Sequence, residues 1–288
     1  MGAMGVAAMR SRPWAAPTGK MPGMDESLDE IPKRRRRGIY LLPNLFTTGT
    51  LFGGFYAIVS AMQGRYEAAC IAIFVAMACD SLDGYIARKT NTASDFGKEY
   101  DSLCDMVAFG VGASLVMFSW SLHHLSEYQW LGGKLGWVIA FTFTACAALR
   151  LARFNVLAMR GGAKGAFFGL PSPGAAAVVF GMVWAADASG LSGRTLLFPA
   201  AFVTLGAAIL MVTNIRFFCL KSLKLTERVP FRYMLAVIAL LALFANDPPH
   251  IFFLVFFCYA LSGPVMAIYR RTQKAPAGAP ADREPPRA

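Results

Sequence analysis

DSLDGYIAR, residues 80–88, ends one long apolar segment of this sequence, and GKEYDSLCD, residues 97–105, begins the next. Each of the two segments has about 20 residues, the length of an α-helix that crosses roughly 30 Å of hydrocarbon. A short polar connection joins them. These features predict two consecutive membrane-spanning helices that carry their charged residues at the same side of the membrane.

Apolar segments of this kind recur along the whole chain. Hydrophobic residues make up 56% of the 288 residues, and the mean hydropathy of +0.47 is higher than a soluble domain of this length shows. The predicted fold is an all-α polytopic membrane bundle of about eight transmembrane helices. The predicted helices cover 44–62, 66–88, 97–121, 135–158, 173–189, 195–213, 230–246 and 249–269.

Two polar tails flank the membrane domain, which we place at 39–270. Residues 1–38 mix Gly, Ala, Pro and charge without periodicity, and 271–288 are rich in Ala, Pro and charge, so both are predicted to be disordered. The N-terminal tail ends in basic residues at 33–37, beside the first apolar segment. This basic run predicts contact with anionic lipid headgroups, a topology signal, or both.

The positions of lysine and arginine predict the orientation in the membrane. All but three of the 28 basic residues fall in tails and loops on one side of the eight-helix arrangement, the exceptions being Arg65, Lys134 and Arg194. Short loops rich in Lys and Arg stay in the cytoplasm. Both termini, and the polar sequence between the second and third helices, are therefore expected on the cytoplasmic side.

Four aspartates lie near the predicted cytoplasmic ends of the second and third helices, namely Asp80, Asp83, Asp101 and Asp105. The spacing i, i+4, i+8 puts Asp80, Gly84 and Arg88 on one stripe of the second helix. The same spacing puts Gly97, Asp101 and Asp105 on one stripe of the third. Because the connection 89–96 is short, we expect antiparallel neighbours with the four carboxylates between them.

Four neighbouring carboxylates need a compensating charge. Two unit charges about 4 Å apart repel by about 4 kcal/mol at an effective dielectric of 20, and one arginine does not neutralise four aspartates. The pattern therefore favours one or two divalent cations over a structural Asp–Arg network. An all-oxygen ligand set selects Mg²⁺ or Mn²⁺ rather than Zn²⁺. Gly84 and Gly97 would leave room for a bulky phosphorylated ligand, and Arg88 is suited to a bidentate phosphate contact.

The string D-x2-D-G-x2-A-R-x8-G-x3-D-x3-D is complete from Asp80 to Asp105. It resembles the signature of the CDP-alcohol phosphatidyltransferase family, which spans two adjacent transmembrane helices. The resemblance implies a six-helix catalytic core, usually in a homodimer, with a cleft open to the cytoplasmic leaflet. We expect a multi-pass protein of the bacterial inner or plasma membrane.

The resemblance also implies roles for individual residues. Asp80, Asp83 and Asp101 would ligate metal, and Asp105 would be a ligand or the general base. The CDP-lipid would contact Gly84, Ala87, Arg88 and Gly97. The sequence LPNLFT, residues 42–47, resembles the start of the family's first helix, where Asn44 and Thr47 reach the nucleotide. A helix N-cap is the alternative for Asn44.

Two further stretches, LRLARFN at 149–155 and FGLPSP at 168–173, resemble the phosphatidylserine synthase branch of the family. Arg150 and Arg153 would lie on the same membrane face as the aspartates, where an arginine pair could bind the carboxylate of serine. Marking the cytoplasmic end of the helix is the alternative for both arginines. Asn155 is a further candidate for acceptor binding, and Leu170-Pro171-Ser172-Pro173 is either a rigid turn near the cleft or a plain loop.

The resemblance therefore implies an enzyme of phospholipid biosynthesis that transfers a phosphatidyl group from CDP-diacylglycerol to L-serine and releases CMP. Glycerol 3-phosphate, choline or an inositol phosphate is the alternative acceptor. Outside the family, the alternatives are a transporter that uses intramembrane carboxylates and an inactive scaffold. Transport sites lie near the membrane midplane, whereas these carboxylates cluster at one face. No nucleic-acid partner is expected, because no aromatic and basic reading surface accompanies the basic tail.

Overall fold

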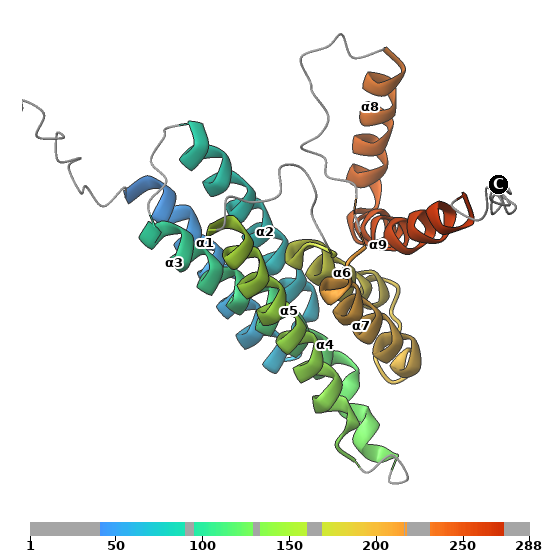
Figure 1. Cartoon of the computed structure of the whole chain (residues 1–288). Helices are drawn as coiled ribbons and strands as arrows, with labels where there is room; N and C mark the ends of the chain where they lie inside the picture. Colours follow the sequence, from blue (N-terminus) through green and yellow to red (C-terminus); the bar gives the residue numbers. More distant parts are fainter. Residues whose placement is uncertain are drawn as a thin grey trace, which may run out of the picture. The chain divides into compact units, whose positions relative to one another are not determined.

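The computed structural model describes residues 41–89, 95–128, 133–159, 169–215, 217 and 231–273, and within these ranges it contains helices and no strands (Figure 1). The α-helices are α1 Leu41–Met62, α2 Tyr66–Lys89, α3 Asp95–Asp105, α4 Ala113–Trp120, α5 Leu135–Met159, α6 Ser172–Ala188, α7 Leu197–Val212, α8 Phe231–Asn246 and α9 Pro248–Gln273. A π-helix, η1 Met106–Gly112, joins α3 to α4, and a 3₁₀-helix, η2 Leu122–Glu127, follows α4.

All eight predicted segments are helical, so the all-α class is confirmed. The third predicted segment consists of α3, η1 and α4 in succession. Among the described residues, five helical stretches are long and apolar enough to cross a membrane, and α6 and α7 are shorter apolar helices. The spans are Asn44–Met62, Tyr66–Ile86, Phe96–Trp120, Leu135–Leu157 and Pro248–Tyr269. A polytopic membrane protein is therefore confirmed, while eight crossings stay a prediction.

The predicted domain limits fall largely outside the described residues. The N-terminal tail, 1–38, is not among them, nor is the chain beyond Gln273. At the C-terminal end, α9 continues to Gln273, past the predicted limit of the membrane domain at 270.

Two glycines of α1 set the packing on which the aspartate-bearing helices depend. A Cβ on Gly53 would lie 2.9 Å from Cβ of Ala76 in α2, and a Cβ on Gly54 would lie 2.8 Å from Cβ of Ala108 in η1. Neither position has room for a side chain. Small residues let membrane helices approach closely, and α1 thereby packs along α2 on one side and along α3, η1 and α4 on the other.

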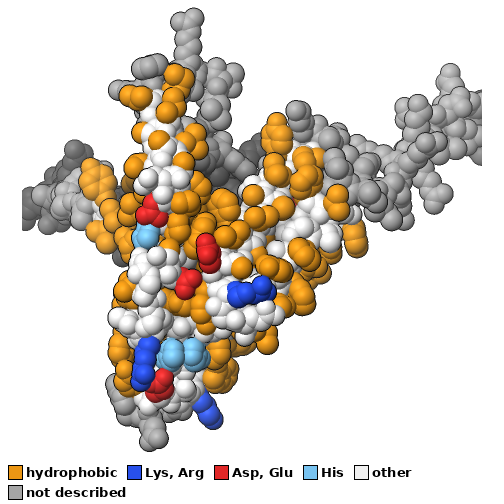
Figure 2. Space-filling view, turned by 180° about the vertical axis from the view of Figure 1, so that it is seen from behind, with side chains coloured by type: hydrophobic (Ala, Val, Ile, Leu, Met, Phe, Trp, Pro, Cys, Tyr) orange, Lys and Arg blue, Asp and Glu red, His pale blue; other side chains and the backbone are white. Residues whose placement is uncertain are grey.

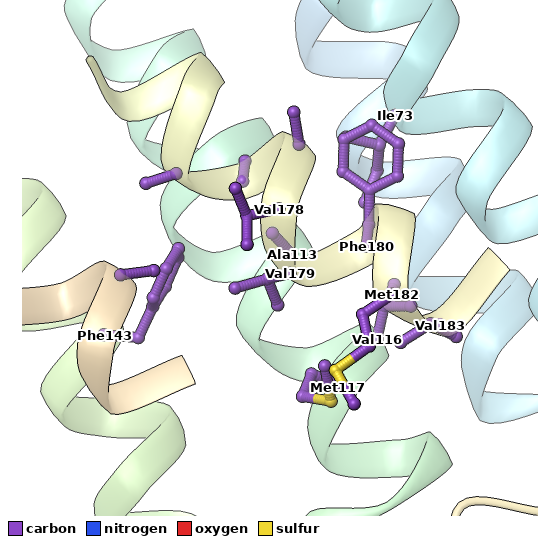
Figure 3. Close-up of a cluster of buried hydrophobic side chains, with 14 of the residues drawn as sticks. Ile73, Ala113, Val116, Met117, Phe143, Val178, Val179, Phe180, Met182 and Val183 are labelled. Atoms are coloured by element: carbon purple, nitrogen blue, oxygen red, sulfur yellow. The ribbon is translucent and has the colours of Figure 1, made fainter. Parts of the chain in front are cut away.

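Helix α6 lies in the interior of the bundle. Every residue from Gly174 to Ala186 is buried, as expected of a helix that is apolar all round. Figure 3 shows Phe180 of α6 beside Ile73 of α2, and Val179 and Val183 of α6, Val116 of α4 and Phe143 of α5 belong to the same cluster. This core anchors α2 and α4 relative to each other.

Apolar side chains also cover much of the surface (Figure 2). Phe52 in α1, Phe202 in α7 and Ile268 in α9 are among many large hydrophobic residues with exposed side chains. In water such a surface would be costly, whereas hydrocarbon solvates it. The last helix joins the core through Phe252, whose ring centroid is 5.2 Å from that of Phe180, and α8 packs on α9.

Candidate active site

Three of the predicted carboxylates converge. Asp80 lies near the end of α2, and Asp101 and Asp105 lie one turn apart at the end of α3. Each offers one carboxylate oxygen, and these three oxygens lie within 4.8 Å of one another. The predicted meeting of the two helices' carboxylates is confirmed for these three residues. Both helices reach this point by packing on α1.

Asp83 is held differently from the other three aspartates. It is 5% exposed, and its Oδ2 accepts a 2.9 Å hydrogen bond from the hydroxyl of Thr47 in α1. A residue three positions after Asp80 lies about 60° around the helix from it, which turns Asp83 toward α1. Among the described residues, the carboxylates that lie close enough together to share one metal ion are those of Asp80, Asp101 and Asp105; metal binding by all four aspartates stays a prediction.

Asp105 has the site's least satisfied polar atom. The residue is 9% exposed, and among the described residues its buried Oδ1 has no hydrogen-bond partner. A buried carboxylate oxygen without a partner costs several kcal/mol unless a cation or donor reaches it. Three carboxylates at this spacing are an all-oxygen donor set, and the open oxygen of Asp105 faces no competing protein group. The residues present therefore fit a hard divalent cation such as Mg²⁺ or Mn²⁺.

The backbone changes its helical type directly after Asp105. Met106–Gly112 is a π-helix, and α-helix resumes at Ala113. π-Helical turns are rare and occur frequently at functional sites. The insertion shifts the rotation of α4 relative to α3, so that Asp101 and Asp105 face α2 while Ala113 and Val116 face the α6 core. The sequence offered no signal for it beyond the two glycines, Gly110 and Gly112.

Of the three residues predicted to bind the acceptor, Arg150 interacts electrostatically with two of the aspartates. Its Nη1 donates a 2.5 Å hydrogen bond to Oγ of Ser172, and its guanidinium lies within electrostatic reach of Asp105 and Asp80. The guanidinium carbon is 5.8 Å from the ring centroid of Phe154. These contacts tie Arg150 to α6, and its role in binding the acceptor stays a prediction.

The other two candidates for acceptor binding contact different elements. The amide of Asn155 donates a 3.0 Å hydrogen bond to Oγ of Ser102, the neighbour of Asp101, and so connects α5 to α3. Arg153 donates a 2.6 Å hydrogen bond to Oδ1 of Asn214, just after α7. Ser102 and Ser172 both stand inside the quoted motifs, although no individual role was predicted for either.

The candidates for nucleotide binding are only partly described. α1 begins at Leu41, so Asn44 lies within its first turn and is not the N-cap; its carbonyl accepts a hydrogen bond of 2.7 Å from the hydroxyl of Thr48. Thr47 is 4% exposed and its hydroxyl serves Asp83. Gly84 and Gly97 are partly buried in α2 and α3. The side chains of Ala87 and Arg88 lie outside the described residues.

The Thr47–Asp83 hydrogen bond predicts a measurable effect on stability. Replacing Thr47 with valine keeps the shape but removes the donor, and we expect the free energy of unfolding to fall by about 2 kcal/mol, the range for hydrogen bonds to charged groups. Thr204→Val is the matched control, because buried Thr204 donates only to the carbonyl of Ala200 four residues earlier. Equal losses in the two variants, measured by thermal unfolding in detergent, would contradict the prediction.

The fold and the site together define a polytopic membrane protein with a metal-competent carboxylate cluster at the ends of two spans. The family model described as CDP-alcohol phosphatidyltransferase matches residues 40–196, more than half of the chain. The chain belongs to this family.

Several named proteins are similar in sequence to this chain over more than half of its length. One is a CDP-diacylglycerol–serine O-phosphatidyltransferase from Helicobacter pylori, 37% identical over 188 residues that cover 65% of this chain and 75% of the relative. A protein of the same name from Mycobacterium bovis is 34% identical over 218 residues, covering 74% and 72%. An archaetidylserine synthase from Methanothermobacter thermautotrophicus is 34% identical over 178 residues, covering 61% and 69%.

Proposed function

We propose that this protein transfers the phosphatidyl group of CDP-diacylglycerol to L-serine, forming phosphatidylserine and CMP. Membership of the family supports the transfer chemistry, and the names of the relatives support serine as the acceptor. The observation that carries the proposal is the convergence of Asp80, Asp101 and Asp105 within 4.8 Å, with the guanidinium of Arg150 close by. In such a site, a metal ion held by the aspartates could bind the pyrophosphate of the donor while the guanidinium of Arg150 binds the carboxylate of serine.

The aspartates would hold Mg²⁺ or Mn²⁺, as one ion or two. The four aspartates would supply the ligands: the carboxylates of Asp80, Asp101 and Asp105 lie within 4.8 Å of one another, and Asp83, on the neighbouring face of α2, accepts a hydrogen bond from Thr47. When bound, a divalent metal neutralises the pyrophosphate and stabilises negative charge on the leaving CMP. Arg88 and the glycines Gly84 and Gly97 would complete the contacts to the CDP moiety, with Asn44 from α1.

The reaction requires a proton acceptor, and we assign that role to Asp105. The hydroxyl oxygen of serine forms a bond to the phosphorus of the phosphatidyl group, and the bond from that phosphorus to the oxygen of CMP breaks. The serine hydroxyl proton passes to a carboxylate oxygen of Asp105. A carboxylate has two oxygens, so one could ligate the metal while the other takes the proton; among the described residues, the buried Oδ1 of Asp105 has no hydrogen-bond partner.

Arg150 is our candidate for the serine carboxylate. A guanidinium binds a carboxylate through two parallel hydrogen bonds, and Arg150 has committed one N–H to Ser172. Arg153 and Asn155 would shape the same side of the site from the next turn of α5. The acyl chains of the donor would stay in the bilayer beside the apolar surface of the helices.

The setting that we propose is a cell membrane, with both termini and the site on the cytoplasmic side. The excess of basic residues in the loops on that side supports the orientation. Anionic lipids would be attracted to the basic residues before α1. A homodimer is the proposed assembly, on the family resemblance.

The test is CMP release by purified protein given CDP-diacylglycerol and Mg²⁺ or Mn²⁺, with and without L-serine. We expect release that depends on serine. Release that ignores serine but rises with choline or glycerol 3-phosphate would keep the chemistry and reject the acceptor. Absence of release with every acceptor, from protein shown to be helical and monodisperse, would reject the enzyme and favour the transporter or scaffold.

A further inference from the structure

Arg150 lies close to the aspartates without forming an ion pair with them. Its guanidinium donates a hydrogen bond to Ser172 and lies near the ring of Phe154, and at longer range it interacts electrostatically with Asp105, Asp80 and Tyr259. A flexible arginine beside several carboxylates would otherwise move onto them, since oppositely charged groups attract strongly away from water. In that position the guanidinium would occupy the carboxylates that could ligate a cation, and it could no longer bind an anionic acceptor. A further contact must therefore keep Arg150 away from the aspartates.

Ser172 is placed to do this. It is 1% exposed, and its Oγ accepts the hydrogen bond from Nη1 of Arg150. The hydroxyl has no part in starting its own helix, because Pro171 is the N-cap of α6 and no side chain caps it. The serine hydroxyl is therefore used for Arg150 rather than for the helix.

The segment that leads into Ser172, the first residue of α6, is held by contacts on two sides. The amides of Gly169 and Leu170 donate hydrogen bonds of 2.9 Å to the carbonyls of Ile215 and Leu210, at the end of α7. Gly169 has φ = +81°, which favours glycine. On the other side, a Cβ on Gly174 would lie 3.6 Å from Cε1 of Tyr259 in α9. Of the predicted turn at 170–173, Leu170 and Pro171 precede α6, whereas Ser172 and Pro173 are the first residues of that helix; α9 packs against the same region.

We propose that Ser172 is a positioning residue that holds the guanidinium of Arg150 apart from the aspartates, so that it meets the carboxylate of the acceptor. The inference rests on the proposed function and deepens it. It makes the start of α6 a determinant of acceptor specificity, acting through Arg150 without touching the reacting atoms. A hydroxyl in this place favours an acceptor that carries its own anionic group.

The experiment compares Ser172→Ala and Ser172→Thr with wild type in steady-state CMP release. Loss of a hydrogen bond to a charged group weakens binding by roughly tenfold. We therefore expect the alanine variant to raise KM for serine about tenfold and to leave KM for CDP-diacylglycerol unchanged. Threonine keeps the acceptor oxygen and should restore KM for serine. Ser121→Ala is the matched control, because Ser121 is buried and donates one hydrogen bond, to the carbonyl of Gly193 between α6 and α7.

A second measurement separates positioning from general damage. In an Arg150→Lys background, Ser172→Ala should change KM for serine little further, because the two residues act as one unit. An undiminished effect in that background would overturn the proposal, as would an alanine variant that behaves like wild type or alters both KM values alike. If the alanine variant does not fold, Ser172→Cys, with a weak acceptor of similar size, is measured in the same way. Wild-type turnover with serine tests the proposed function separately, since failure there leaves no acceptor site for Ser172 to serve.

Discussion

Asp105→Asn is expected to lower serine-dependent CMP release by at least about a hundredfold, the lower range for loss of a general base. Asparagine fills the same space but cannot take up the serine proton, and it removes a full negative charge from a set of oxygens that lie within 4.8 Å of one another. Steady-state assays at saturating metal and both substrates measure the loss as kcat. The helices should remain intact, because among the described residues Oδ1 of Asp105 has no hydrogen-bond partner to lose.

The matched control is Asp187→Asn, which makes the same chemical change near the end of α6, outside the carboxylate cluster. It should retain wild-type turnover. Mn²⁺ binding, followed by electron paramagnetic resonance, then divides the two roles of Asp105. Weakened binding in Asp105→Asn marks it as a ligand, and unchanged binding with lost turnover marks it as the base alone. Substantial turnover in Asp105→Asn would remove Asp105 from the mechanism.

The helices could be predicted from sequence because hydrocarbon imposes a strong and local rule. A segment that crosses the membrane must be apolar over a fixed length, and the limits of the segments predicted at 44–62, 66–88 and 195–213 differ by at most a few residues from those of α1, α2 and α7. The convergence of Asp80 with Asp101 and Asp105 followed from helical spacing and a short connection. Both inferences use information within one or two neighbouring segments.

The remaining features depend on how helices rotate against one another. Thr47 donates to Asp83 only because Gly53 and Gly54 bring α1 close to α2 and η1. The π-helix after Asp105 changes the rotation of α4 relative to α3. Apart from Gly110 and Gly112, no residue pattern in 106–112 indicates it. Likewise, the hydrogen bond between Arg150 and Ser172 joins α5 to α6. The two residues are too far apart in the sequence for helical periodicity to predict their contact.

Removal of divalent metal is expected to abolish activity and to make Asp101→Asn more stable than wild type, the reverse of the order expected with metal bound. Three carboxylates within 4.8 Å repel when no cation is bound, by about 4 kcal/mol for a pair 4 Å apart at an effective dielectric of 20. After chelation, Asp101→Asn should therefore unfold at a higher temperature than wild type. With saturating Mg²⁺ or Mn²⁺ the order should invert, because a ligand at a hundred times its Kd stabilises the folded state by about 2.7 kcal/mol.

Thermal unfolding with chelator and with added metal measures both orders in the same preparations. Asp187→Asn again serves as the control, and its metal response should equal that of wild type. An unchanged order would show that the carboxylates repel too weakly to need a cation, and full turnover after exhaustive chelation would show that none is used. Inversion together with metal-dependent turnover would mean that the cluster is a destabilised site, whose electrostatic strain is relieved by the cation on which the transfer depends. The same negative charge would attract the guanidinium of Arg150, and in our proposal the hydrogen bond to Ser172 opposes that attraction.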